Sequence, residues 1–370
     1  MRRILCLAAA VLCLLRQPVP VLAAQPESRV LVEVSTGRVL SEEGADIRRP
    51  VGSLVKLMTA YLTGLAVEEG RLDTQTVLTA GQEVAGMQGA VIWLEPGDTV
   101  SVHELLLGLI TGNAGDAAAV LACAVSGSTE RFVMDMNAAG FDLGMRSTRF
   151  ADPQGFDRPD SYSTARDMAR LACAVLRCEV LAPYLDVWRT FIRGDRVELV
   201  NENTLTRTLE GCRGLKAAHS EAAGYSVIAA AEEDGMCCAA VVLGCTDEAQ
   251  RFSAARSLLH RGFAGYRVVT PGFSEEFLRP MRIRGGTQSA VIPHIKGLAP
   301  LAVPAGAQTQ AVLVQPEYVE APVREGQVLG RVYFYAGDTL LEEAVLVCPQ
   351  EIPRLTLGVS LRDVLHLLFS

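Results

Sequence analysis

The chain contains two long apolar runs that meet at a turn. Residues 224–245, GYSVIAAAEEDGMCCAAVVLGC, place Glu-Glu-Asp-Gly between these runs, which is the signal of a two-stranded hairpin. Residues 29–40, RVLVEVSTGRVL, alternate apolar and polar around a Thr-Gly turn and predict a second hairpin near the start of the chain. The chain is therefore expected to build a fold that contains a sheet.

Helical spacing fills most of the stretch between the hairpins. Apolar residues recur at helical intervals over residues 53–67, and residues 101–125 carry a helical pair around GNAGD. Residues 130–144 and 163–178 are helical again after capping residues, and another helix is expected over 248–263. This order predicts an α/β (α+β) domain, with an antiparallel sheet flanked by helices and an inserted helical subdomain.

The composition changes after Gly265, and 370 residues leave room for a second domain. Residues 267–356 are short strands such as QAVLVQ, RVYFYA and EEAVLV, separated by Gly or Pro, and predict an all-β domain after a first domain over 25–266. The last stretch, 357–370, puts leucines on one helical face. Its fourteen residues are too few to span a bilayer, so we expect an amphipathic tail that docks on the β-domain or anchors in a membrane surface.

The first residues indicate the compartment. Two arginines precede the twelve apolar residues Ile4–Leu15, and the small-residue end Leu22–Ala24 follows. This is the layout of a cleaved secretory signal over residues 1–24, with an uncleaved anchor as the alternative. The protein is therefore expected to be exported, to the extracytoplasmic face of the membrane, the cell wall or the periplasm. A formal net charge of −8 without a basic block argues against a nucleic-acid partner.

The cysteines do not form a recognisable framework. Ten are present, two of them inside the predicted signal, and most of the others lie in apolar runs such as LACAV. Their spacing fits neither a zinc site nor a small disulfide scaffold, so we expect small buried hydrophobes. The histidines are scattered, and neither a metal nor another cofactor is expected.

Residues 52–62, GSLVKLMTAYL, place a lysine three positions after a serine at the start of an apolar helix. Positions i and i+3 share a helix face, so the side chains of Ser53 and Lys56 can meet. A serine hydroxyl needs a base within hydrogen-bond reach, and a desolvated lysine can accept its proton. The serine N–H at a helix N-terminus also points toward a developing oxyanion. Taken alone, the motif is more often a chance pattern with a surface lysine than a catalytic pair.

The surroundings of this motif resemble the D-alanyl-D-alanine carboxypeptidases, which are low-molecular-mass penicillin-binding proteins of the serine-lysine class. The resemblance is carried, in order, by VEVSTGRVL, RRPVGSLVKLMTAYL, LEPGDTVSVHELLLGLI, MNAAGFDLGMRSTRFADPQGFD, YSTARDMARLA, NENTL, GLKAAHSEAAGYSVIAAAEEDGM and APVREGQVLGRVYF. It implies a serine-lysine β-lactamase/transpeptidase-like fold. It also implies that Ser53 attacks the carbonyl between the two terminal D-alanines of a peptidoglycan stem peptide, and that water later hydrolyses the acyl-enzyme. β-Lactams would acylate the same serine.

The family uses three motifs, and only the first is intact, as Ser53-Leu-Val-Lys56. The second, Ser-x-Asn, aligns without gaps on Asn113-Ala114-Gly115, which puts Asn113 where a serine hydroxyl passes a proton to the leaving amine. An alignment with compensating gaps instead keeps Thr111-Gly112-Asn113 as Thr-x-Asn. A plain loop between two helices is the third interpretation.

The third motif, Lys-Thr-Gly, is Lys216-Ala217-Ala218. Lys216 can attract the substrate carboxylate, but Ala217 lacks the hydroxyl that would bind it. Such a loss costs about 1.5–3 kcal/mol, or roughly ten- to a hundredfold. The methyl of Ala218 crowds the substrate edge, and the backbone N–H of His219 aligns with the second oxyanion donor. These changes predict a retained fold with slow acylation and impaired turnover.

Three rivals remain to the carboxypeptidase. A catalytically silent relative would bind wall peptide or a partner, and a β-lactamase of the same class would release penicillin quickly. A structural envelope protein would tolerate the replacement of Ser53 and Lys56.

Overall fold

The computed structural model describes residues 27–269, 278–356 and 358. The predicted signal over 1–24 and nearly all of the predicted tail over 357–370 lie outside the described residues.

A five-stranded antiparallel sheet forms the centre of the first domain, in the order β2-β1-β9-β8-β7. Its strands are β1 Ser28–Glu33, β2 Val39–Glu43, β7 Cys212–Ser220, β8 Gly224–Glu233 and β9 Met236–Cys245. Both predicted hairpins are thereby confirmed. Strand β7 ends the sheet and leaves one of its edges unpaired within the described residues.

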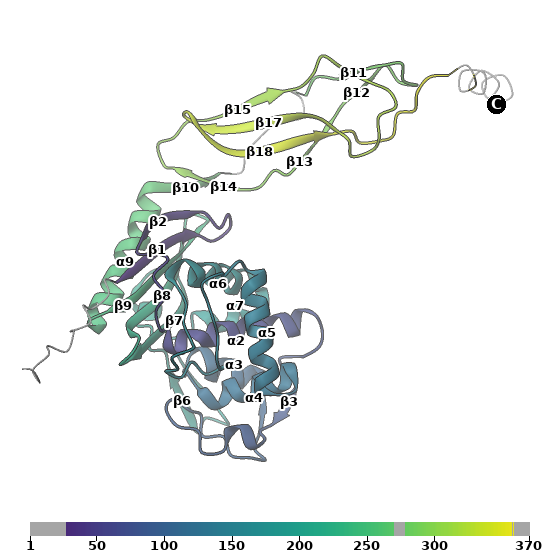
Figure 1. Ribbon diagram of the computed structural model, residues 1–370. Helices are drawn as coiled ribbons and strands as arrows, with labels where there is room; N and C mark the ends of the chain where they lie inside the picture. The colour runs from purple at the N-terminus through teal and green to yellow at the C-terminus, as the bar shows by residue number, and fades with distance from the viewer. Residues whose placement is uncertain (1–26, 270–277, 357, 359–370) are drawn as a thin grey trace, which may run out of the picture.

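The two apolar runs are apolar because both faces of β8 and β9 are covered. Ile228 and Val241, which lie opposite each other in the ladder, face the helical half of the domain. Val227 and Val242 face the other way, beneath α9 (Glu248–Gly265). Figure 1 shows α9 on one side of the sheet and the larger helices of the domain on the other. A strand that is buried on both faces does not alternate between apolar and polar residues.

The helical half is built around α2 (Lys56–Glu68), which contacts each of the larger helices of this half. These helices are α3 Val102–Ile110, α4 Gly115–Ser126, α5 Thr129–Asp142 and α6 Ala165–Arg177. They confirm the predicted helices, with one difference at the start of the first. Residues Gly52–Val55 form a separate 3-10 turn, η1, before α2 begins.

Short elements complete this domain. The strand pairs are β3 Val77–Thr79 with β4 Thr99–Ser101, and β5 Arg189–Ile192 with β6 Val197–Val200. The short helices are η2 Gln82–Val84, η3 Glu179–Leu181, α7 Ala182–Leu185 and α8 Leu205–Thr208. Ser101 and Glu104 form a capping box that fixes the start of α3.

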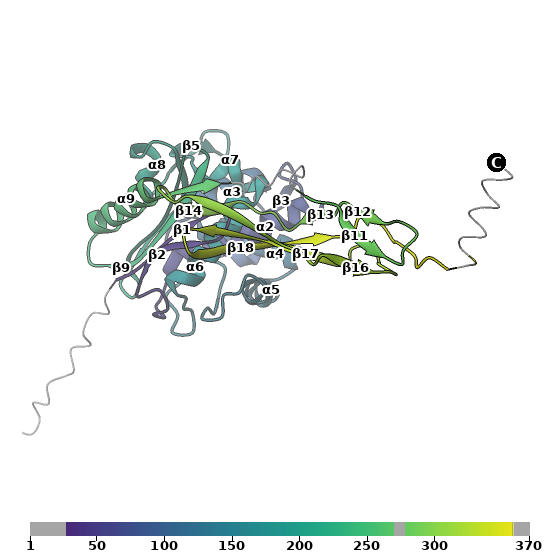
Figure 2. The same cartoon turned by 90° about the horizontal axis from the view of Figure 1, so that it is seen from above.

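The C-terminal region is all β and extends from the end of α9 (Figures 1 and 2). Its strands are β10 Tyr266–Val269, β11 Met281–Arg284, β12 Ala290–Val291, β13 His294–Lys296, β14 Leu301–Pro304, β15 Thr309–Val314, β16 Tyr318–Glu320, β17 Val328–Ala336 and β18 Thr339–Val347. Strands β15, β17 and β18 confirm the three predicted apolar strands. The region has two apolar cores of its own, and the limits 25–266 and 267–356 stay a prediction.

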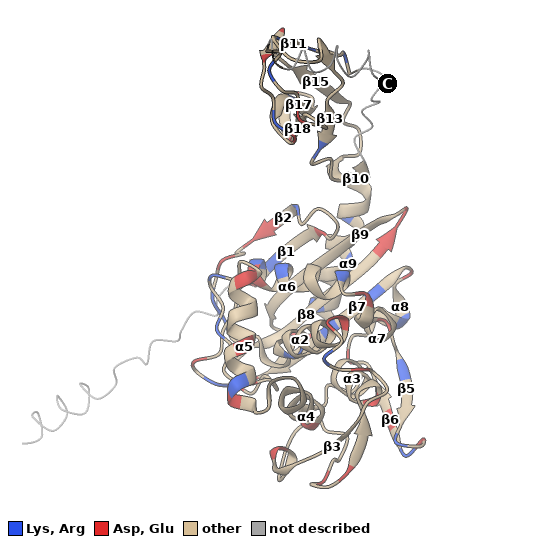
Figure 3. Ribbon diagram, turned by 90° about the vertical axis from the view of Figure 1, so that its right-hand side faces the viewer, with Lys and Arg blue, Asp and Glu red and all other residues tan. Residues whose placement is uncertain are grey.

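Two further properties concern the chain as described. The eight cysteines outside the predicted signal are all free, and five of them are buried. Among the described residues, no single helix is long and apolar enough to cross a membrane; α4 and α5 meet the criteria only as a pair bent by 82°. Acidic and basic residues are interspersed over both halves of the molecule (Figure 3).

Candidate active site

Ser53 lies in η1, where the start of α2 meets the edge strand β7. The chain enters this turn through Gly52, whose φ of 51° is a conformation that side chains rarely adopt. Leu54 and Val55 are buried and hold the turn in the core, whereas Ser53 remains half-buried. The serine is therefore presented at a surface by a turn whose other side chains anchor it.

The loop that follows α5 touches this turn through Gly155. A Cβ at Gly155 would lie 2.3 Å from Gly52 O and 2.9 Å from Ser53 Cα, and the φ of Gly155 is 77°. Only glycine fits at this close approach. The sequence DPQG thus has a clear structural role, because it lets the loop pass directly over the serine backbone.

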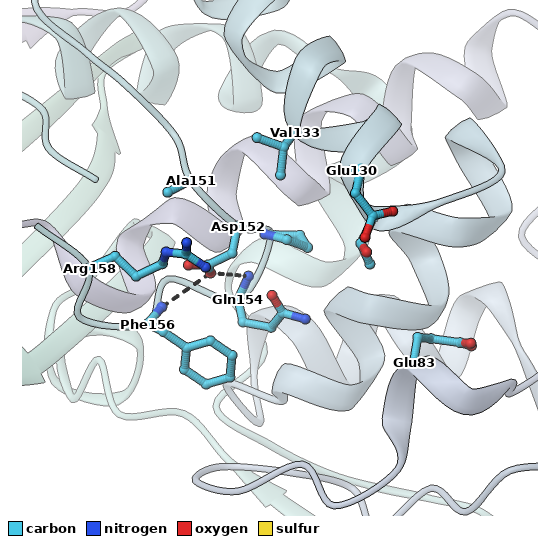
Figure 4. A pocket seen from close by; sticks show the side chains of 10 residues that line it. Glu83, Glu130, Val133, Ala151, Asp152, Gln154, Phe156 and Arg158 are labelled. Atoms are coloured by element: carbon cyan, nitrogen blue, oxygen red, sulfur yellow. Dashed lines mark hydrogen bonds between the residues drawn. The ribbon is translucent and has the colours of Figure 1, made fainter. Parts of the chain in front are cut away.

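Asp152 and Thr59 hold that loop in place. Asp152 Oδ1 accepts the backbone N–H of Gln154 at 3.0 Å and of Phe156 at 3.2 Å (Figure 4), and also that of Gly155 at 2.5 Å. Thr59 Oγ1, on α2, donates to Pro153 O at 2.9 Å. The carbonyl of Gln154 is thereby fixed above the first turn of α2.

Lys56 is the first residue of α2 and its side chain is 5% exposed. Its Nζ donates to Gln154 O at 2.6 Å, and among the described residues no hydrogen bond joins it to Ser53. Burial lowers the pKa of Lys56 to about 8, against the opposing effect of Glu202, Asp152 and Asp116. About a tenth of Lys56 is therefore neutral at pH 7, and this is the form in which a lysine can accept a proton.

Lys216 lies on β7 and is 2% exposed. Its Nζ donates to Leu109 O at 3.1 Å and to Ile110 O at 3.2 Å, at the C-terminal end of α3, where a cation is favoured. Burial lowers its pKa to about 7; Lys56 lowers it further, and Glu202 opposes the change. The ammonium of Lys216, which was predicted to attract a substrate carboxylate, is therefore hydrogen-bonded to backbone carbonyls in this structure.

The second motif lies in the connection between α3 and α4. Asn113 has a φ of 57°, and its Nδ2 donates to Glu202 Oε1 at 3.3 Å. Within the described part of the chain, Asn113 Oδ1 and Thr111 Oγ1 are buried without a hydrogen-bond partner. Gly115 already belongs to α4. Each alignment therefore places an unpartnered polar atom in the connection that directly follows the two carbonyls bound by Lys216.

The remaining third-motif residues lie on both faces of β7. Ala217 is 1% exposed and packs in the core beneath α9, on the sheet face opposite Lys216, because side chains alternate along a strand. Ala218 is buried on the helical side. His219 is exposed, and its ring stacks on Tyr225 with centroids 3.9 Å apart. The Ala217 side chain therefore does not line the surface that the sequence interpretation assigned to it.

Sequence reasoning missed the charge of Glu202 as a part of the site. The neighbouring asparagines form a turn, in which Asn201 Oδ1 accepts the N–H of Asn203 at 2.9 Å and Asn203 Oδ1 accepts the N–H of Leu205 at 3.2 Å. This turn leaves the carboxylate of Glu202 beside Asn113. The sequence signal for this role is a single charged residue, Glu202, between two asparagines that form a turn.

A pocket of about 520 Å³ is lined in part by the loop that contains Asp152 (Figure 4). Its charged lining residues are Glu83, Glu130, Asp152 and Arg158. Ser53 and the two lysines are not among the described residues that line it. The predicted catalytic residues therefore lie at the junction of η1, β7 and the α3–α4 connection, and not in this pocket.

Fold and site together define a serine-lysine enzyme class, and comparisons with known proteins agree. A family model described as D-alanyl-D-alanine carboxypeptidase matches residues 16–247. D-alanyl-D-alanine carboxypeptidase DacC of Escherichia coli is 30% identical over 87% of this chain and 83% of its own length. The corresponding DacF of Bacillus subtilis is 26% identical, over 90% and 87%.

Solved structures give the same result. Penicillin binding protein 5 from Haemophilus influenzae has a TM-score of 0.79 and 26% identity, covering 88% of this chain and 97% of that chain. A penicillin-binding protein of Listeria monocytogenes in its ampicillin-bound form has a TM-score of 0.58 and 27% identity, over 66% and 100%. The chain belongs to the D-alanyl-D-alanine carboxypeptidase family, and it is a penicillin-binding hydrolase of the serine-peptidase class.

Proposed function

We propose that Ser53 forms the acyl-enzyme in a D-alanyl-D-alanine carboxypeptidase reaction on peptidoglycan stem peptides. One observation carries this proposal: a half-buried serine lies one helical turn from a buried lysine whose pKa is about 8. Neutral Lys56 takes the hydroxyl proton as Ser53 attacks the carbonyl between the two D-alanines. The terminal D-alanine leaves with a proton on its amine, and water then releases the shortened peptide.

The oxyanion is stabilised by two backbone N–H groups, those of Ser53 and His219. The position of Ser53 at the helix N-terminus supports the first assignment, and that of His219 on the edge strand supports the second. In the Thr-x-Asn alignment, the hydroxyl of Thr111 passes a proton to the leaving amine, and its lack of a hydrogen-bond partner among the described residues supports this role. In the gap-free alignment, Lys56 returns the proton to the leaving amine, and the Asn113 carboxamide only hydrogen-bonds the reacting groups.

Turnover is impaired relative to an enzyme with three intact motifs. Lys216 is held by the α3 carbonyls, so substrate has to draw its ammonium away. The second candidate function, a silent relative that binds wall peptide or a partner, is favoured by this same contact.

A fluorescent penicillin separates these functions. The mature protein should acquire one covalent label, seen by gel fluorescence and as a single adduct by intact mass, and Ser53→Ala should abolish it. Release of D-alanine from a pentapeptide ending in D-Ala-D-Ala should then be slow but saturable. Labelling without D-alanine release would support the silent relative, and a wild-type protein that stays unlabelled would remove Ser53 as the nucleophile.

The place of action follows from the ends of the chain. The layout of residues 1–24 supports export to the extracytoplasmic side, and the leucine face of 357–370 supports peripheral membrane contact. Deletion of 357–370 should move the protein from the membrane fraction to the soluble fraction. An unchanged distribution would exclude the tail as an anchor.

A further inference from the structure

Trp93 has a conformation that is unusual for its size. Its φ is 54°, in the left-handed region, and its side chain is 69% exposed. A bulky residue in this region is strained and persists only when its surroundings enforce the conformation. The indole is therefore presented to solvent at a cost in stability.

A buried carboxylate, that of Asp116, holds the backbone on both sides of Trp93 from the core. Asp116, on α4, is 1% exposed. Its Oδ2 accepts the N–H of Ile92 at 3.0 Å and of Leu94 at 3.0 Å. The side chains of Ile92 and Leu94 are buried, being 0% and 6% exposed. With both neighbours directed into the core, the side chain between them faces outward.

An arginine, Arg193, holds the carbonyl groups of the same segment. Arg193, in the turn between β5 and β6, donates from Nη1 to Ile92 O at 3.2 Å and to Trp93 O at 2.8 Å. Its Nη2 donates to Asp98 Oδ2 at 2.6 Å. The peptide groups around Trp93 are thus held by two charged side chains from different elements.

The segment that carries Trp93 borders the candidate active site. Gly115, two residues after Asn113, donates its N–H to Ala90 O at 2.8 Å. A Cβ at Gly115 would also lie 3.7 Å from Gln154 Cγ. Three residues of chain span at most about 11 Å, so Trp93 lies at the rim of the site, on the side of the second motif.

We propose that Trp93 is a stacking platform for a sugar ring of the glycan strand to which the stem peptide is attached. This inference rests on the proposed function for its choice of ligand. The C–H face of a pyranose is apolar and flat enough to cover an indole, and its hydroxyl groups need polar acceptors nearby. The exposed carboxylate of Glu95 supplies one. A membrane surface fits less well, because the exposed carboxylate of Glu95 would face anionic headgroups.

The binding test uses the tryptophan itself. The chain has two tryptophans, so Trp188→Phe leaves Trp93 as the only indole reporter. Peptide-free glycan strands, prepared by complete removal of stem peptides, should cause a saturable change in its emission. In the otherwise unmodified chain, Trp93→Ala should weaken glycan co-sedimentation by about tenfold, a loss typical of one aromatic stacking contact. Trp93→Tyr should keep most of the affinity.

Phe141→Ala is the matched control, because Phe141 is a 62% exposed aromatic on α5. It should leave glycan binding unchanged. If Trp93→Ala binds glycan like the unmodified chain, or if the emission of Trp93 responds to phosphatidylglycerol vesicles but not to glycan, the proposal is overturned. The titration needs no turnover, so an enzyme that fails to release D-alanine but binds glycan through Trp93 would refute the proposed function alone.

A kinetic measurement adds a second readout. In Trp93→Ala, kcat/KM for pentapeptide attached to glycan should fall about tenfold, while kcat/KM for the free pentapeptide and the rate of penicillin acylation stay unchanged. An equal fall for both substrates would indicate a structural role and contradict the platform.

Discussion

Replacement of Glu202 by glutamine is expected to shift the pH dependence of Ser53 acylation to lower pH. Only neutral Lys56 can accept the serine proton. Burial lowers the pKa of Lys56 to about 8, and Glu202 is the foremost of the acidic groups that hold it up. Glutamine removes this charge, while its amide oxygen can still accept the hydrogen bond from Asn113. The neutral fraction of Lys56 at a given pH should therefore increase.

The magnitude follows from the two protonation states. With a pKa of about 8, roughly 1% of Lys56 is neutral at pH 6 and half is neutral at pH 8, so acylation should rise about fiftyfold across this interval. An exposed carboxylate has a modest and salt-screened effect. Glu202→Gln should thus be about two- to fivefold faster than the unmodified chain at pH 6, with the two rates converging above pH 8.

The assay is the second-order rate of labelling by a fluorescent penicillin between pH 6 and 8.5 at constant ionic strength. Glu233→Gln is the matched control. It also removes one exposed carboxylate, but Glu233 lies at the β8–β9 turn and is not among the groups that shift the pKa of Lys56. A shift to higher pH in Glu202→Gln, or the same shift in Glu233→Gln, would refute the electrostatic reasoning. A rate that does not change with pH in the unmodified chain would refute Lys56 as the base.

Other substitutions test the site and its supports. Gly155→Ala should lower the thermal midpoint and slow labelling more than tenfold, whereas Gly70→Ala, at a φ of 70° with open space around it, should affect stability alone. Glu33→Gln should lower the free energy of unfolding in urea by about 2–3 kcal/mol, because this buried carboxylate accepts four hydrogen bonds from the β1–β2 turn; no change would show that the turn holds without it. Thr111→Val should slow D-alanine release if the Thr-x-Asn alignment is correct, and unaltered release would leave the gap-free alignment. The pKa of Lys216 is about 7 in the folded protein, against an ordinary value of 10.5. The free energy of unfolding should therefore rise with pH between these two values. Lys216→Met should flatten this rise when it is measured by urea unfolding, and an equally steep rise in the variant would contradict the burial of Lys216.

The elements of the fold could be predicted because their signals are local. Helical spacing located α2 and α6, and the Glu-Glu-Asp-Gly turn located the β8–β9 hairpin. The start of α2 could not be placed correctly, since the pattern of apolar residues continues through η1. Only the close approach of Gly155 and the positive φ of Gly52 show why the chain turns there.

The site could be predicted only in part, for a physical reason. The spacing of Ser53 and Lys56 is local and readable from the sequence. The contacts of Lys216 with the end of α3 join residues 106 and 107 positions apart, and the contact between Asn113 and Glu202 joins residues 89 positions apart. No local pattern reports such pairings, so the occupied ammonium of Lys216 and the charge of Glu202 appeared only in three dimensions.

The two buried lysines also bear on the choice between an enzyme and a silent relative. Each is at most 5% exposed, and the charge of Lys56 lowers the pKa of Lys216. No carboxylate lies within ion-pair distance of either ammonium among the described residues. A buried cation without a paired anion is costly, and an apolar side chain of similar volume would stabilise the same core. Fold stability alone therefore does not explain the pair, whereas a base that must be partly neutral near pH 7, beside a cation able to meet a carboxylate, requires this arrangement.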